Sequence, residues 1–152
     1  MPSRSIIRTY TLHSAVVCYD NGSNFVVAII DDMLGMKYTE LAAGYTVLDM
    51  DIANNFAFVC GHKGASAFFA CIDLTQLTNG VGNILYQETS SATVLKRLSA
   101  YVAPSGTTKL VAIGESEYVH GEYPTICEMS TTSPLYKGFP ALTPTTTAWS
   151  NS

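Results

Sequence analysis

Short apolar runs separated by turn-forming residues make up most of the chain. The runs are rich in Thr, Val, Tyr, Phe and Ile, residue types that favour the pleated, half-buried surface of a β-strand. Turn residues separate them at Asp20-Asn21-Gly22, Asn54-Asn55, Asn79-Gly80 and Pro104-Ser105-Gly106. The stretch Met33–Ala43 has some helical character, but its β-rich neighbours favour a strand. Because short strands with regular turns are typical of all-β folds, the pattern predicts a sandwich, barrel or propeller.

Three segments of this pattern resemble one another: Asn24–Ile30, Asn55–Gly61 and Thr108–Gly114. Another apolar strand and a turn precede each of them, and further strand candidates follow. The repeat predicts one β domain over residues 1–140, with units at approximately 6–44, 45–90 and 91–140, followed by a tail at 141–152. We expect each unit to be an antiparallel four-stranded meander, because three such meanders fit the roughly 40–50 residues of a propeller blade.

The expected strands share an apolar run bounded by turn residues. They are Ile6–Leu12, Ala15–Tyr19, Asn24–Ile30 and Met36–Leu41 in the first unit; Val47–Ile52, Asn55–Gly61, Ala67–Asp73 and Asn83–Gln87 in the second; and Leu95–Val102, Thr108–Gly114, Thr125–Met129 and Leu135–Phe139 in the third.

The middle unit carries a resemblance to a known group of proteins. Its runs Val47–Ile52 (VLDMDI), Asn54–Gly61 (NNFAFVCG) and Cys71–Leu74 (CIDL) resemble blades of propeller-like proteins of unknown function from gut bacteria, most of them expected to be exported. The resemblance is strongest over residues 47–74 and next strongest over 94–129. It concerns the fold and brings no catalytic motif. It implies an extracytoplasmic location, whereas the lack of a signal peptide in the sequence leaves the cytoplasm open.

An arc of three blades leaves a physical problem at its two ends. Propellers close with typically 4–8 blades, and an open arc would expose apolar blade faces of the kind that mark association sites. Two copies related by two-fold symmetry would close a six-bladed ring, so we expect a homodimer. The alternatives are that the chain is part of a longer protein, or that it forms a closed sandwich or barrel.

Composition and charge exclude several classes of protein. Hydrophobic residues make up 47% of the 152 residues, which is ample apolar surface for a folded core and argues against disorder. The net charge of −4 argues against a nucleic-acid partner, since nucleic-acid binders show a basic face. The longest apolar run, Phe25–Ile30, is far shorter than the roughly 20 residues of a membrane helix, so we expect no membrane span.

Two groups of residues are candidates for binding. Asp49 and Asp51 lie two apart on an expected strand and therefore share one face, where they could bind a cation or act as acid and base, or serve as a solvated face or turn cap. Tyr118, His120 and Tyr123 lie in the long connection from Gly114 to Tyr123, and long loops on rigid β scaffolds often carry binding residues.

Other chemistries lack a motif. The four cysteines, at positions 18, 60, 71 and 127, have no C-x-x-C spacing, so we expect small buried side chains, no metal site and no cofactor. The sequence favours a non-enzymatic binding or interaction module that recognises a protein or a glycan. The alternative is a hydrolase or lyase acting on polysaccharide, which would use a pair of carboxylates.

Overall fold

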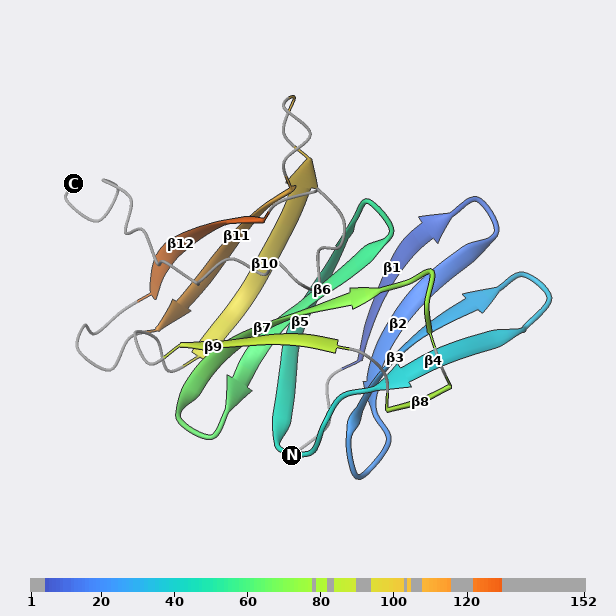
Figure 1. The fold of residues 1–152 in the computed structure, drawn as a ribbon, viewed down its shortest axis with the longest axis horizontal. Helices are drawn as coiled ribbons and strands as arrows, with labels where there is room; N and C mark the ends of the chain where they lie inside the picture. Colours follow the sequence, from blue (N-terminus) through green and yellow to red (C-terminus); the bar gives the residue numbers. More distant parts are fainter. Residues whose placement is uncertain are drawn as a thin grey trace.

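The protein is an all-β molecule of three antiparallel sheets that follow one another along the chain (Figure 1). The computed structural model describes residues 5–77, 79–81, 84–89, 94–102, 104, 108–115 and 122–129. Figure 1 shows the middle sheet between the other two. The all-β class expected from the sequence is confirmed, and the segment Met33–Ala43 contains a strand rather than a helix.

The first sheet is an antiparallel meander with one added parallel strand. Its strand order is β1-β2-β3-β4-β8. The strands are β1 (Ile6–Thr11), β2 (Ser14–Asp20), β3 (Phe25–Asp31), β4 (Met36–Glu40) and β8 (Gly80–Val81). The short β8 comes from the connection between two strands of the middle sheet and pairs in parallel with β4, with Thr39 opposite Gly80. Asn79 completes this clip, since its backbone N–H donates to the Tyr38 carbonyl at 2.8 Å.

The middle and third sheets are antiparallel meanders with strand orders β5-β6-β7-β9 and β10-β11-β12. The strands of the middle sheet are β5 (Tyr45–Ala53), β6 (Phe56–Lys63), β7 (Ser66–Asp73) and β9 (Ile84–Thr89). Those of the third sheet are β10 (Val94–Val102), β11 (Thr108–Glu115) and β12 (Glu122–Met129). Asn54 and Asn55, both at positive φ, form the two-residue turn between β5 and β6, as asparagine does in tight hairpins.

A β-bulge recurs at the same place in the first strand of the middle and third sheets. The register slips by one residue between Val47 and Asp49 in β5, and between Leu95 and Arg97 in β10. A glycine lies opposite each bulge, Gly61 in β6 and Gly114 in β11. A Cβ atom on Gly61 would overlap the backbone carbonyl of Thr46, and one on Gly114 would overlap that of Val94. The bulge therefore requires glycine, and it places Asp49 and Arg97 at equivalent positions of two sheets.

The middle sheet is buried on both faces. Along β6 and β7, alternate side chains point to opposite sides, as the two-residue period of a strand requires. One set packs with the first sheet in a large apolar cluster that includes Val59, Phe68 and Ala70. The other set, which includes Phe58 and Phe69, packs with Leu95 and Leu98 of the third sheet. These two junctions hold the three sheets together.

The expected strands within the described residues match the structure closely, with differences in the alignment of the repeats and in the connection before β9. The segment Asn24–Ile30 was aligned with Asn55–Gly61 and Thr108–Gly114, but it forms β3, the third strand of its sheet, whereas the other two form second strands. The turn at Asn79-Gly80 leads into β8. The fourth strand expected at Leu135–Phe139 and the tail at 141–152 lie outside the described residues.

Candidate functional site

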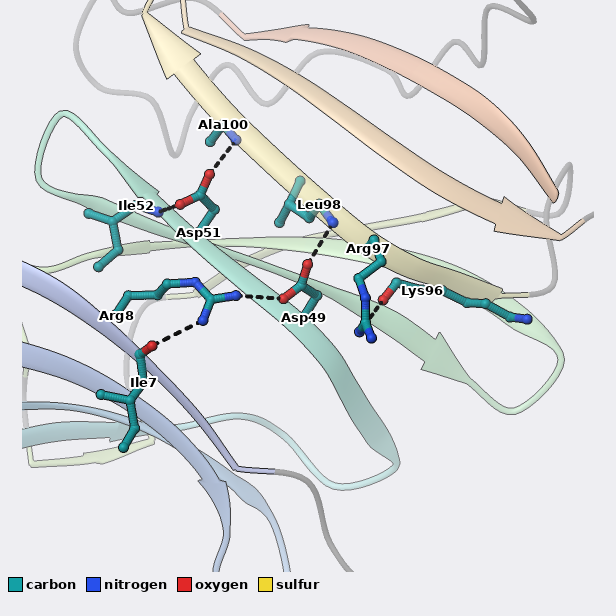
Figure 2. Close-up of polar contacts among 9 residues, drawn as sticks. All are labelled: Ile7, Arg8, Asp49, Asp51, Ile52, Lys96, Arg97, Leu98 and Ala100. Carbon is teal, nitrogen blue, oxygen red and sulfur yellow. Dashed lines mark hydrogen bonds and ion pairs between the residues drawn. The ribbon is translucent and has the colours of Figure 1, made fainter.

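The first strands of the three sheets meet at one place, where β5 lies beside both β1 and β10. Asp49 and Asp51 point from β5 toward β10, on one face of the strand as their spacing predicts (Figure 2). The Arg8 side chain extends from β1 to Asp49, and Arg97 lies on β10. The carboxylates of Asp49 and Asp51 thus connect β5 with Arg8, which is 41 positions away in the sequence, and with residues of β10 that are 49 positions away.

Both oxygens of Asp49 have partners. Its Oδ1 accepts a hydrogen bond from the Arg8 guanidinium at 3.1 Å, and its Oδ2 accepts one from the backbone N–H of Leu98 at 2.8 Å. The Asp49 side chain is 8% exposed, whereas that of Arg8 is 41% exposed. A buried carboxylate is costly unless it is paired and hydrogen-bonded, and Asp49 meets both conditions. It is therefore an anchor between sheets.

Asp51 repeats the arrangement one step along the strand. Its Oδ2 accepts a hydrogen bond from the backbone N–H of Ala100 at 2.8 Å, and its Oδ1 accepts one from Ile52 at 2.9 Å. Leu98 and Ala100 lie opposite Ala112 and Leu110 of β11. Because hydrogen-bonded and non-hydrogen-bonded pairs alternate along an antiparallel ladder, N–H groups at every second residue of β10 point away from β11. The two carboxylates thus replace the partner strand that the edge of β10 lacks here.

A shallow pocket of about 320 Å³ opens beside this cluster. Arg8, Asp49 and Arg97 supply its charges, and Ile7 and Leu48 supply apolar wall. The exposed Arg97 guanidinium donates to the carbonyl of Lys96 at 3.4 Å, and none of the carboxylates whose side chains the structure describes lies within ion-pair distance of it. Figure 2 shows Arg8 and Arg97 approaching from either side of Asp49. With Asp49 already paired to Arg8, the pocket retains the positive charge of Arg97.

Cys60 lies behind this cluster and is chemically inert. Burial raises the pKa of its thiol strongly, the Asp49 charge adds to the rise, and Arg97 opposes it. Burial also raises the pKa of Cys18 and of Cys71 to about 12. All three are free and buried, which confirms that these cysteines are small core residues. A thiol that keeps its proton is a poor nucleophile and a poor metal ligand.

The other candidate residues fare differently. Tyr118 and His120 lie outside the described residues. Tyr123 is expected in a loop, but its backbone belongs to β12, opposite Gly114. The strand begins three residues earlier than expected, because Glu122, Tyr123 and Pro124 pair with Glu115, Gly114 and Ile113 of β11. No cluster of three or more His, Cys, Asp or Glu within the described ranges is arranged to hold a metal ion. In that same part of the chain, no helix has the length and apolarity to cross a membrane.

Sequence reasoning found the acidic half of the site and missed the basic half. Arg8 and Arg97 have no motif around them, and each lies in a different sheet from the aspartates. A signal was present for Arg97, since Gly61 and Gly114 lie opposite equivalent bulges, and superposing the two bulges aligns Asp49 with Arg97.

No family model, no curated protein and no solved structure matches this chain.

Proposed function

We propose that this protein is a non-catalytic binding module that recognises an acidic glycan through a sugar carboxylate bound at Arg97. The supporting observation is the exposed guanidinium of Arg97 in a pocket whose one aspartate is already paired. A carboxylate matches the planar fork of donors that arginine presents. The protein has a net charge of −4, so the protein as a whole does not attract an acidic ligand. The attraction comes from the local positive charge of Arg97.

The dimensions of the pocket support a single sugar unit as the bound group. Its volume of about 320 Å³ is at the lower end of the range of small-molecule sites. Ile7, whose side chain is 66% exposed, and Leu48 offer an apolar wall for the C–H face of the ring. Arg8 is held in place by Asp49 and by the Ile7 carbonyl at 3.0 Å, so its other N–H groups are already oriented. Such preorganisation lowers the entropy cost of binding.

Carboxylate catalysis has less support. It requires two carboxyl groups facing one substrate, one of them able to hold a proton. The four oxygens of Asp49 and Asp51 accept hydrogen bonds from Arg8, Leu98, Ile52 and Ala100. Each of the four oxygens is thus already engaged by a partner within the protein, and none is directed at a substrate. The pair is better suited to joining two strands than to acid–base work.

The test is titration of the protein with oligogalacturonate, an uncharged galactose oligomer of equal length, and a short poly-glutamate peptide. We expect binding of oligogalacturonate alone, weakening with added salt as surface ion pairs do. Arg97→Gln should weaken it by about tenfold or more, and Arg97→Lys should restore part of it, since lysine keeps the charge and loses the fork. Lys37→Gln, which removes a charge from β4 of the first sheet, is the matched control and should leave the affinity for oligogalacturonate unchanged.

Three results would contradict the proposal. Equal binding of the charged and uncharged sugars would remove the role of the carboxylate. Equal weakening by Arg97→Gln and Lys37→Gln would remove the role of this pocket. Binding of poly-glutamate in place of the sugar would assign the pocket to a protein ligand.

A further inference from the structure

Two neighbouring turns at one end of the first sheet display large apolar side chains to solvent. Leu12, in the turn between β1 and β2, is 97% exposed; Met33 and Leu34, in the turn between β3 and β4, are 86% and 84% exposed. We call these three residues the turn tip. Single exposed apolar residues are ordinary, but a group of them marks an interaction site.

The turn tip is held firmly by polar contacts beneath it. The Asp32 N–H donates to the His13 carbonyl at 2.9 Å, and the His13 imidazole lies 3.0 Å from the Asp32 carboxylate, which ties the two turns together. Asp31 Oδ1 accepts hydrogen bonds from the N–H groups of Met33 and Gly35 at 2.9 and 2.8 Å. The apolar side chains are therefore displayed by a fixed scaffold.

Leu34 occupies a backbone conformation that suits a different residue. Its φ is +62°, in the left-handed region where glycine and asparagine are at ease and other residues cost about 1 kcal/mol or more. The exposed leucine gains no packing within the chain in return. Strain of this kind is found where a residue serves a binding role, which points to contact with another molecule.

A groove of about 590 Å³ adjoins the turn tip. Ile29, Met36, Leu74 and Leu77 give it an apolar lining. Asp31 and Lys37 also line it. Asp31 Oδ1 is engaged by the turn N–H groups, whereas no carboxylate whose side chain the structure describes lies within ion-pair distance of Lys37. The groove thus offers an apolar floor with an available lysine, directly beside a projecting apolar tip with the negative charge of Asp32.

We propose that this end of the first sheet is a two-fold contact between two copies of the chain. The turn tip of each copy enters the groove of the other, and Asp32 of each approaches Lys37 of its partner. A two-fold contact requires one surface that carries both complementary halves, and this end does. A lipid surface fits less well, because it cannot fill a groove, and a tip bearing Asp32 lacks the basic cluster that attracts anionic lipids.

Sedimentation equilibrium of the full chain tests this contact, with Leu34→Asn as the main variant. Asparagine accepts a positive φ, so the variant should fold with equal or greater thermal stability while its dimer dissociation constant rises by about tenfold or more. A stability change alone would move the melting temperature and leave association intact. Tyr101→Thr, which removes an exposed apolar side chain from the far strand β10, is the matched control and should leave association unchanged.

A charge exchange tests the pairing itself. Asp32→Lys and Lys37→Asp should each weaken the dimer by about tenfold, and the double variant should recover most of the loss. A chain that is monomeric at every concentration overturns the proposal. A dimer that survives Leu34→Asn also overturns it, because that dimer must form through another surface. A monomer that binds phosphatidylcholine vesicles through Leu34 would assign the tip to lipid instead.

Discussion

The two junctions between sheets are built differently. The first junction, between the first and middle sheets, is an apolar cluster that includes Val16, Met50 and Phe68, crossed by the polar contacts of Arg8 with Asp49 and of Tyr10 with Asn55. The second junction, between the middle and third sheets, also has an apolar cluster, which includes Phe58, Phe69 and Leu95. There, Asp49 and Asp51 bind the backbone of β10 directly.

Apolar contacts and charge-assisted hydrogen bonds make different contributions to these junctions. Apolar burial is strong but non-directional, so a large cluster stabilises the first junction while leaving the relative register of the sheets to other contacts. At the second junction, the charge-assisted hydrogen bonds to Leu98 and Ala100 set how far β10 lies along β5. Such bonds are geometrically demanding and roughly twice as strong as neutral ones. The second junction therefore has a directional constraint in addition to its apolar contacts.

Adjacent phenylalanines in β7 offer the largest test of this comparison. Phe68 packs in the first junction, against Tyr45 with ring centroids 4.7 Å apart, and Phe69 packs in the second. Both are fully buried. We expect Phe68→Ala to cost about 4 kcal/mol of the unfolding free energy and Phe69→Ala about 3 kcal/mol, measured by urea denaturation.

Hydrogen exchange then locates the damage. Phe69→Ala should reduce protection in β10 and β11 and leave β2 and β3 protected, because the first junction is intact. Phe68→Ala should reduce protection throughout. Equal loss in the first and third sheets with both variants would mean that the two junctions unfold as one unit.

Removing the carboxylate of Asp49 or of Asp51 should lower the unfolding free energy by less than the phenylalanine substitutions do, and Asp49 should have the larger effect. Asp49→Ala leaves the Leu98 N–H and the Arg8 guanidinium without their partner, and we expect a loss of about 2–3 kcal/mol. Asp51→Ala leaves one backbone N–H of β10 unpaired and should cost about 1 kcal/mol. Asp49→Asn, which keeps an acceptor for Leu98, is the control and should lie between them. A larger loss for Asp51→Ala than for Asp49→Ala would contradict the anchoring role of Asp49.

Alkaline pH distinguishes the junctions by their thiols. Cys18 lies in the first junction, whereas Cys60 and Cys71 lie in the second. Burial raises the pKa of Cys18 and Cys71 from 9.0 to about 12 and that of Cys60 further. The folded chain therefore keeps protons that the unfolded chain releases, so this stability is complete below a pH of about 9 and is lost as the pH rises.

Each thiol contributes a slope of at most about 1.4 kcal/mol per pH unit above that point. The double variant Cys60→Ala with Cys71→Ala should flatten the alkaline loss about twice as much as Cys18→Ala. Unfolding free energies from denaturant titrations across this pH range measure both slopes. A flatter curve for Cys18→Ala than for the double variant would be the contrary result.

Most of the strands could be predicted because they depend on local pattern. The runs Val47–Ile52 and Ala67–Asp73 lie within β5 and β7, since apolar β-formers between turn residues have few other conformations open to them. β8 could not be predicted, because two residues after a turn have no periodicity. It exists only because Thr39 and Glu40 of β4 lie opposite Gly80 and Val81 and pair with them.

The candidate site could be predicted only in part for a related reason. The shared face of Asp49 and Asp51 follows from their spacing, but their partners are backbone N–H groups of Leu98 and Ala100, which every sequence contains. Side-chain identity therefore carries no information about them. Arg8 and Arg97 enter the pocket through the packing of separate sheets, a long-range arrangement that a local pattern does not encode.

The clip formed by β8 has a consequence for the chain during its synthesis. β4 can pair with β3 as soon as both have left the ribosome, but Gly80, which covers Thr39, follows 41 residues later. At ordinary elongation rates this interval lasts roughly 2–8 s. Over that time the nascent first sheet has an open edge, the feature by which strands of different chains pair and aggregate. Synthesis of β8, in the connection between β7 and β9, ends this interval, so the second unit supplies the residues that cover the edge of the first.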